Sequence, residues 1–183
     1  MNATTAARVK SEKGFTLVDM LFVVALVGLL STLAIPGVMR ARGAAQSASA
    51  LGTLRVINSA QLSFAITCGL GFYSPEFRPL ARIPPGALDA FLAPELATGP
   101  TFVKSGYNFS MAGTPMPGAP ASCNGLAIGE AAGGYAVVAD QLDVASNSRF
   151  FGSNADGVIY EHSTTLGLVM PEGGAPSDGA PLK

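Results

Sequence analysis

The sequence predicts an α+β protein, in which one long N-terminal helix packs on a small antiparallel sheet of about three or four strands. The helix is indicated by a 21-residue apolar run at 15–35, followed by apolar residues at helical spacing up to Cys68. The sheet is indicated after residue 104 by short segments that alternate apolar and polar residues between Gly-rich turns. A helix followed by a run of strands is typical of this class.

The composition shows an excess of hydrophobicity in a chain of 183 residues, a length that fits one domain. Hydrophobic residues make up 49% of the chain and charged residues 13%, about half the charged share of an ordinary soluble domain. The net charge of −1 argues against a nucleic-acid surface. Two cysteines and one histidine argue against a structural zinc site, and we expect no metal and no cofactor.

The hydrophobic excess lies near the N-terminus. Residues 1–14 carry three basic residues and one acidic residue, and the run 15–35 follows with Asp19 as its only charge. As a helix this run spans about 32 Å, which matches a hydrocarbon core of about 30 Å. We expect the basic leader to stay in the cytoplasm and the C-terminal part to lie outside. Arg40 and Arg42 weaken this asymmetry without reversing it, since a large domain translocates largely regardless of charge.

Two other interpretations of this segment follow from the residues alone. An ordinary secretory signal has an apolar core of about 7 to 15 residues, and here the small residues typical of its cleavage site come only at 44–48. A plain membrane anchor explains the length, but it leaves Asp19 with no role beyond a favourable interaction with the helix N-terminus. A carboxylate in hydrocarbon is rare and usually has a partner, so Asp19 separates these interpretations.

Residues 13–21, Lys-Gly-Phe-Thr-Leu-Val-Asp-Met-Leu, resemble the class III signal of type IV prepilins and type II secretion pseudopilins. The resemblance implies that a prepilin peptidase removes the leader 1–14 by cutting between Gly14 and Phe15. It also implies that the new N-terminal Phe15 is methylated on its amine. The mature chain would keep its apolar helix and have 183 − 14 = 169 residues.

Asp19 is the fifth residue counted from Phe15, a position where the family has an acidic residue, nearly always Glu. The resemblance implies that this assembly carboxylate pairs with the N-terminal amine of a neighbouring subunit, although Asp is one methylene shorter than Glu. Gly28 and Pro36 match the positions of a common pilin Gly and a helix-kinking Pro. The segment 15–36 is therefore expected to be a transmembrane helix that becomes the filament core.

The segment 37–68 is predicted to be the amphipathic half of the same helix, which would then extend over some 80 Å in all. Its opposite side, with Arg55, Asn58 and Ser59, is expected to face solvent or other subunits. The face expected to pack on the sheet has residues at spacings of three and four: Leu54, Ile57, Gln61, Phe64 and Cys68.

A pilin-like globular head is predicted over 69–170, with a flexible tail at 171–183. A Gly cap at 69–71 ends the helix, and six prolines between residues 72 and 101 indicate a connecting loop with a short helix at 86–92. The last two predicted strands are joined by a turn that contains Asp156 and Gly157. The strands are expected at 105–111, 134–140, 149–151 and 157–161.

The chain offers few reactive side chains. Cys68 and Cys123 are expected to form a disulfide in an exported domain, and the alternative is two buried free thiols. Pilins often close a C-terminal loop with a disulfide, whereas this one would tie the helix end to the middle of the domain. His162 is the single histidine and no Gly-x-Ser-x-Gly occurs, so no catalytic residue is expected. Residues 154–157 match a calcium loop only in part and are predicted to form a turn.

The signal and the fold class together predict a structural subunit of a type IV pilus, which is not an enzyme. The resemblance implies an inner-membrane precursor and then a periplasm-spanning or extracellular filament. It implies as partners identical or related pilin subunits, the prepilin peptidase, an assembly ATPase, an inner-membrane platform protein and, before assembly, membrane lipid. No nucleic acid is expected, since the mature chain has 8 basic and 11 acidic residues.

Two alternatives remain open at the level of sequence. The first is a pseudopilin of a type II secretion system, and the second is a membrane-tethered periplasmic binding domain that does not polymerise. Major pseudopilins often carry an Asp-Pro-Trp-Gly segment, and this chain has no Trp. The pilus subunit is therefore favoured over the pseudopilin.

Overall fold

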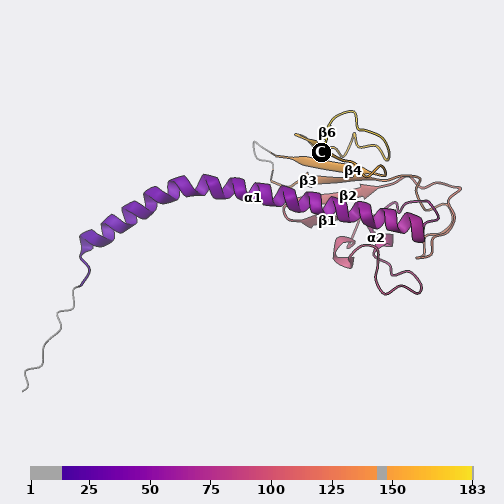
Figure 1. The fold of residues 1–183 in the computed structure, drawn as a ribbon, viewed down its shortest axis with the longest axis horizontal. Helices are drawn as coiled ribbons and strands as arrows, with labels where there is room; N and C mark the ends of the chain where they lie inside the picture. Colours follow the sequence, from indigo (N-terminus) through magenta and orange to yellow (C-terminus); the bar gives the residue numbers. More distant parts are fainter. Residues whose placement is uncertain (1–13, 144–147, 183) are drawn as a thin grey trace, which may run out of the picture. The chain divides into compact units, whose positions relative to one another are not determined.

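The computed structural model describes residues 14–143 and 148–182 (Figure 1). Of the predicted leader, only Gly14 lies among the described residues. The chain divides into two compact units, 1–43 and 44–183. Helix α1 (Leu17–Thr67) forms the apolar segment of the first unit and, from residue 44 on, the first element of the second.

The second unit contains an antiparallel sheet of six strands, each paired with the next one along the chain. The predicted α+β class is confirmed, but the predicted number of about three or four strands is wrong. The two additional strands, β1 and β6, are the two edges of the sheet. The strands are β1 (Thr101–Lys104), β2 (Tyr107–Ala112), β3 (Ala136–Gln141), β4 (Phe150–Asn154), β5 (Ile159–His162) and β6 (Ala180–Pro181).

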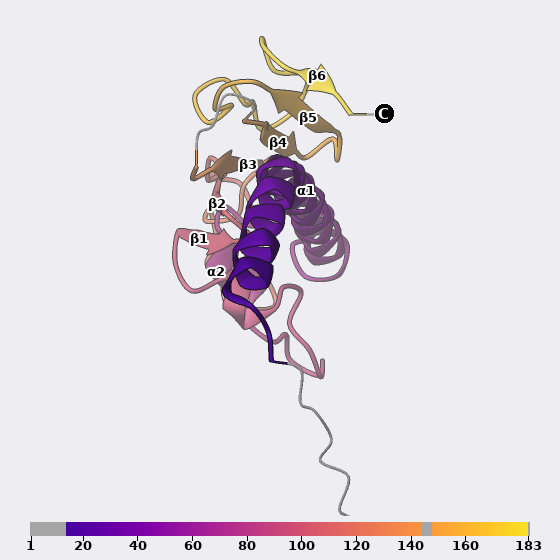
Figure 2. The ribbon, with the colours of Figure 1, turned by 90° about the vertical axis from the view of Figure 1, so that its left-hand side faces the viewer.

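The hydrophobic core lies between the sheet and the part of α1 that belongs to the second unit. Figures 1 and 2 show this part of α1 lying along one face of the sheet. The predicted face of the helix is confirmed, because Leu54, Ile57, Gln61 and Phe64 are fully buried and Cys68 is 3% exposed. The facing side chains of β2 alternate as the sequence predicts, and the buried ones are Tyr107, Phe109 and Met111.

Gln61 is a buried polar residue in this core, and its hydrogen bonds explain why it is tolerated there. Its side-chain amide donates to the carbonyl oxygen of Ser74 at 2.8 Å and accepts from the Ser74 N–H at 2.9 Å. A buried amide that is satisfied in this way avoids the desolvation penalty of an unpaired polar group. The pair also fixes the first residues of the loop that leaves α1.

A glycine cap ends α1, as predicted for residues 69–71. A Cβ on Gly69 would lie 2.2 Å from the carbonyl oxygen of Phe72, a distance that no other residue type can accept. The N–H groups of Gly69 and Gly71 donate to the carbonyl oxygens of Phe64 and Ala65, at 2.7 and 2.8 Å. The last turn of the helix therefore satisfies its own carbonyl groups.

The connection between α1 and the sheet differs from the prediction. A helix at 86–92 was expected, whereas the structure has α2 (Phe77–Leu80) and a 3-10 turn, η1 (Pro94–Leu96). Phe77 of α2 packs edge-on against Phe102 of β1, with 5.0 Å between the ring centroids. This buried aromatic contact, which lies outside any local sequence pattern, holds α2 against the sheet (Figure 2).

Asn58 is a second local difference, because the sequence places it on the side of α1 that faces solvent or other subunits. In the structure its amide donates to the hydroxyl of Ser153 at 2.7 Å and its carbonyl oxygen accepts from the Tyr135 hydroxyl at 3.0 Å. Asn58 therefore binds β4 and the residue just before β3 from the edge of the packed face. Arg55 and Ser59 are exposed, as predicted.

Candidate functional site

The first unit presents an apolar helix with exposed side chains. Among the described residues, α1 is the one helix long and apolar enough to cross a membrane, with a mean hydropathy of 2.4 over 18 residues and none of them buried. The large apolar side chains between residues 15 and 39 are 47–81% exposed. Soluble monomers rarely expose a contiguous apolar surface of this extent. By its length and composition, this segment could therefore be a single membrane span.

The polar side chains within this apolar segment are satisfied inside the helix. The Ser31 hydroxyl donates to the carbonyl oxygen of Val27 at 2.8 Å, and the Thr32 hydroxyl donates to that of Leu29 at 2.8 Å. In hydrocarbon an unsatisfied polar group costs several kcal/mol, so these bonds suit the helix to an apolar environment. The carboxylate of Asp19 is the ionised group that this segment must accommodate.

Thr16 and Asp19 cap each other at the start of α1. The Asp19 N–H donates to the Thr16 hydroxyl at 3.2 Å, while the Thr16 N–H and hydroxyl donate to Asp19 Oδ2 at 3.0 and 2.7 Å. This reciprocal arrangement is a capping box, and a carboxylate in the first turn also interacts favourably with the helix dipole. The second carboxylate oxygen, Oδ1, takes no part in these three bonds. The sequence-based predictions do not include the capping role of Thr16, although the Thr-x-x-Asp spacing is the signal that indicates it.

The structure brings together three of the residues that the sequence singles out. Gly14 and Phe15 directly precede α1, and Asp19 lies in its first turn. Gly28 and Pro36 lie further along the helix, which continues through Pro36 without interruption. Cleavage after Gly14, methylation of Phe15 and a kink at Pro36 stay predictions.

The predicted disulfide between Cys68 and Cys123 is confirmed. It joins the end of α1 to the loop between β2 and β3, and the Cys123 N–H also donates to the Cys68 carbonyl oxygen at 3.2 Å. The next residue, Asn124, donates from its amide to the carbonyl oxygen of Pro79 in α2 at 2.7 Å. The loop is thus fixed to two helices over two consecutive residues.

The predicted turn at residues 154–157 is confirmed, since the Gly157 N–H donates to the Asn154 carbonyl oxygen at 2.9 Å. The side chains of the turn bind the C-terminal segment. The Asn154 amide donates to the carbonyl oxygens of Pro171 and Gly174, and Asp156 Oδ2 accepts from the Gly174 N–H at 2.7 Å. Within residues 14–143 and 148–182, no group of three or more His, Cys, Asp or Glu side chains lies close enough to hold a metal ion.

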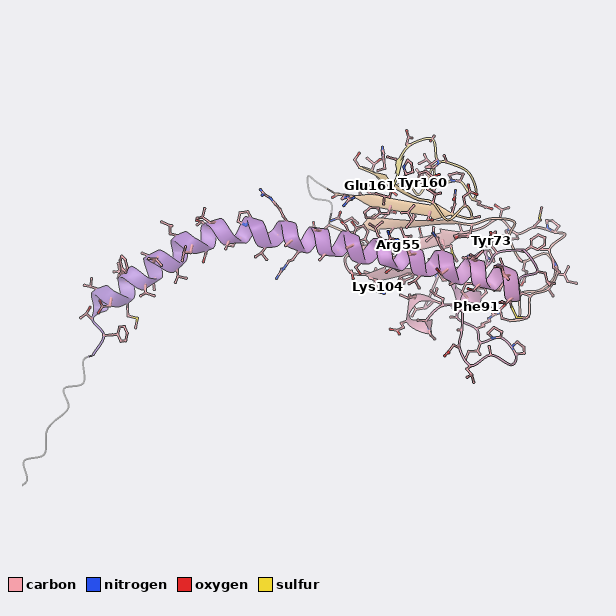
Figure 3. The ribbon with its side chains drawn as sticks, in the orientation of Figure 1. Arg55, Tyr73, Phe91, Lys104, Tyr160 and Glu161 are labelled. Carbon is pink, nitrogen blue, oxygen red and sulfur yellow. A yellow bond between two sulfur atoms is a disulfide. The ribbon has the colours of Figure 1, made fainter. Side chains whose placement is uncertain are left out.

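His162, the single histidine, ends β5, and its Nδ1 lies 2.8 Å from the hydroxyl oxygen of Thr164. The preceding residue, Glu161, forms an ion pair with Arg149, in which Arg149 Nη2 donates to Glu161 Oε2 at 2.6 Å. Figure 3 shows Glu161 at the side of the sheet formed by β4 and β5. The hydrogen bonds from the Arg149 guanidinium lower the pKa of the Glu161 carboxyl below its usual value of 4.5. The pair links the residue just before β4 to β5.

Glu161 is expected to make the stability of the second unit depend on pH in the acid range. Because its pKa is lower in the folded state than in the unfolded chain, its contribution is fully present above about pH 4.5. The contribution is lost as the pH falls through the folded-state pKa. The pair is partly exposed, so we expect at most about 1 kcal/mol. Urea unfolding of the full chain in detergent, in buffers from about pH 6 to about pH 3, measures this contribution to stability.

In that experiment Glu161→Gln should lose stability mainly above pH 4.5 and converge with the wild type in acid. Glu95→Gln, which changes an exposed carboxylate of η1, is the matched control and should follow the wild-type curve. A constant difference between Glu161→Gln and the wild type at every pH would contradict the assignment to an ion pair.

Comparison of the chain with protein-family models, with curated proteins and with solved structures gave no match. An interpretation of its function therefore rests on three features of the chain itself. These are the Gly14–Phe15 junction, the exposed apolar helix with Asp19 capped at its start, and the α+β unit that α1 enters.

Proposed function

We propose that this protein is the structural subunit of a type IV pilus. It is made as a prepilin in the inner membrane, cut after Gly14, methylated on the amine of Phe15 and polymerised through its apolar helix. The observation that carries the proposal is the exposed apolar helix between residues 15 and 39, which begins at the capped carboxylate of Asp19. In a filament the same side chains would be buried against the helices of neighbouring subunits, which supplies the hydrophobic driving force for assembly.

The continuity of α1 argues against removal of the apolar segment as an ordinary secretory signal. The small residues at 44–48 lie inside α1, and Ser47 is only 6% exposed. The Ser47 hydroxyl lies 3.2 Å from the hydroxyl of Tyr107 in β2. A cut at this point would remove a helical turn that packs on the sheet. A cut after Gly14 leaves the whole helix in place, which supports processing of the prepilin type.

The geometry at Asp19 suggests how its carboxylate serves assembly. Oδ2 is engaged by Thr16 within the same chain, and Oδ1 is the oxygen that the cap does not use. A cut after Gly14 would create a positively charged amine on Phe15, one residue before Thr16. In a bundle of apolar helices, Oδ1 would accept from the amine of a neighbouring subunit, so that two charges in hydrocarbon compensate each other.

The alternatives differ from this proposal in ways that experiments can separate. A type II secretion pseudopilin would use the same helix, and the absence of Trp favours the pilus. A tethered periplasmic binding domain would keep residues 1–14 and form no filament. The proposed partners are sister subunits, the prepilin peptidase, the assembly ATPase and the platform protein.

We expect filaments sheared from the cell surface to contain this chain as a 169-residue subunit that begins with N-methyl-Phe15. Electron microscopy of the sheared fraction and mass spectrometry of the N-terminal peptide are the two measurements. Asp19→Asn keeps an acceptor for the cap but removes the charge, and should lower the yield of filaments about tenfold, the factor that corresponds to about 1.4 kcal/mol. Asp19→Glu restores the family's residue and should assemble like the wild type.

The Asp19 variants and the wild-type chain each have an outcome that would contradict the proposal. Both chains must still be cut, since the change lies beyond the Gly14–Phe15 junction. If Asp19→Asn assembles as well as Asp19→Glu, the carboxylate charge has no role in assembly. If wild-type chains recovered from the cell retain residues 1–14 and no filaments contain them, the tethered domain replaces the pilus subunit.

A further inference from the structure

Two arginines lie just beyond the apolar segment of α1. Between Asp19 and Arg40 the chain has 20 residues without a charge, which as a helix rise about 30 Å. This rise equals the thickness of the hydrocarbon core of a bilayer, about 30 Å. When Asp19 lies at one surface of the membrane, Arg40 and Arg42 therefore lie at the other.

The arginines are unpartnered within the part of the chain that the structure describes. Both side chains are exposed, and neither forms a hydrogen bond or ion pair with another described residue. Arg55, a further exposed arginine of α1, is labelled in Figure 3 and belongs to the second unit. The charges of Arg40 and Arg42 are thus available to a partner outside the chain.

The spacing of the two arginines indicates what kind of partner suits them. Positions two apart on an α-helix differ by about 200° around the axis, so the two side chains leave the helix on nearly opposite sides. A single neighbouring protein that packs against one side of the helix would meet only one of them. A layer of lipid headgroups surrounds a membrane helix and meets both.

We propose that Arg40 and Arg42 bind the phosphate groups of anionic phospholipids at the outer surface of the membrane and fix the depth of the helix before assembly. A guanidinium matches a phosphate through two parallel hydrogen bonds, and the aliphatic stem of Arg lets the charge reach the interface. The inference deepens the proposed function and rests on its membrane-inserted precursor. Entry into a filament would then require these phosphate contacts to break.

The absence of Trp from the chain allows a direct test in vesicles with the full-length protein. Val38→Trp introduces a single tryptophan at a half-exposed position next to the arginines. Its emission is measured in vesicles that contain brominated phosphatidylglycerol or brominated phosphatidylcholine, both of which quench Trp on contact. We expect the anionic lipid to be preferred about thirtyfold, the combined factor for two arginines near an anionic surface.

The matched variants carry the same reporter. Arg40→Gln combined with Arg42→Gln should reduce the preference to about one, while Arg55→Gln should leave it unchanged. Equal quenching by the two lipids in the chain with both arginines would overturn the inference. Equal quenching combined with loss of filaments in the Gln double variant would overturn it in favour of a contact with a second subunit. Met39→Trp repeats the test if the Val38→Trp chain fails to insert.

The same measurements distinguish failure of the inference from failure of the proposed function. A lipid preference in a chain that never forms filaments supports the arginine–phosphate contacts and refutes the pilus subunit. Trp emission that neither brominated lipid quenches, with either reporter, shows that the helix is outside the bilayer. That result overturns the inference together with the inserted precursor on which it rests.

Discussion

A Gly14→Ala variant is expected to accumulate as the uncut precursor of 183 residues and to form almost no filaments. The proposed peptidase must fit the residue before the scissile bond, and in the family that this N-terminus resembles that residue is Gly. A Cβ on Gly14 would meet no other atom within 4 Å, so the substitution leaves the described fold undisturbed. A loss of maturation in this variant therefore reports on recognition by the peptidase and not on unfolding.

The measurement is a denaturing gel with mass spectrometry of the N-terminal peptide, in cells that contain the peptidase. Gly28→Ala is a matched control, because a Cβ there also meets nothing within 4 Å and the residue lies beyond the proposed cut. Gly28→Ala should be cut as completely as the wild type. The proposed processing would be refuted if the Gly14→Ala variant is still cut to a chain that begins at Phe15, or if the wild-type chain keeps its leader.

The helical half of the fold could be predicted from the sequence because its signal is periodic and local. The spacing of Leu54, Ile57, Gln61 and Phe64 places them on one face, and the structure buries that face completely. The predicted helix end is also correct, since a Cβ at position 69 would lie 2.2 Å from the carbonyl oxygen of Phe72 and glycine is therefore required there. Both features depend on residues close together in the chain.

The edges of the sheet could not be predicted in the same way. β1 has four residues and follows a proline-rich loop, so its alternation is too short to stand out. β6 has two residues and includes Pro181, which cannot donate to a ladder. Each strand exists because a neighbour pairs with it, and the β5–β6 pairing joins Glu161 to Ala180 across a loop that no local pattern describes.

The candidate site shows the same division between local and distant information. The capping partner of Asp19 is three residues away, and the Thr-x-x-Asp spacing predicts this contact. Asn58 was misplaced because its partner Ser153 is 95 residues away. Residues that act through distant side chains become recognisable only when the fold is known, whereas the proposed N-terminal signal is inferred from consecutive residues.

Removal of the disulfide with Cys68→Ser and Cys123→Ser is expected to lower the free energy of unfolding of the second unit by about 4 kcal/mol. The bond closes a loop of 55 residues, and in the chain-entropy model a loop of this length confers about that much stability. Small domains are stable by only about 5–15 kcal/mol, so the loss is a large fraction of the total. The side chain of Cys68 is only 3% exposed, so the Cys68→Ser change also buries a hydroxyl group.

Urea unfolding of the full chain in detergent measures this effect, with the wild type in dithiothreitol as a second way to open the bond. A Cys68→Ala, Cys123→Ala variant controls for the buried hydroxyl and should match the reduced wild type. If the reduced and oxidised proteins unfold at the same urea concentration, the bond does not stabilise the fold. The predicted loss would make stability depend on an oxidising compartment, which is what a domain exported across the inner membrane encounters.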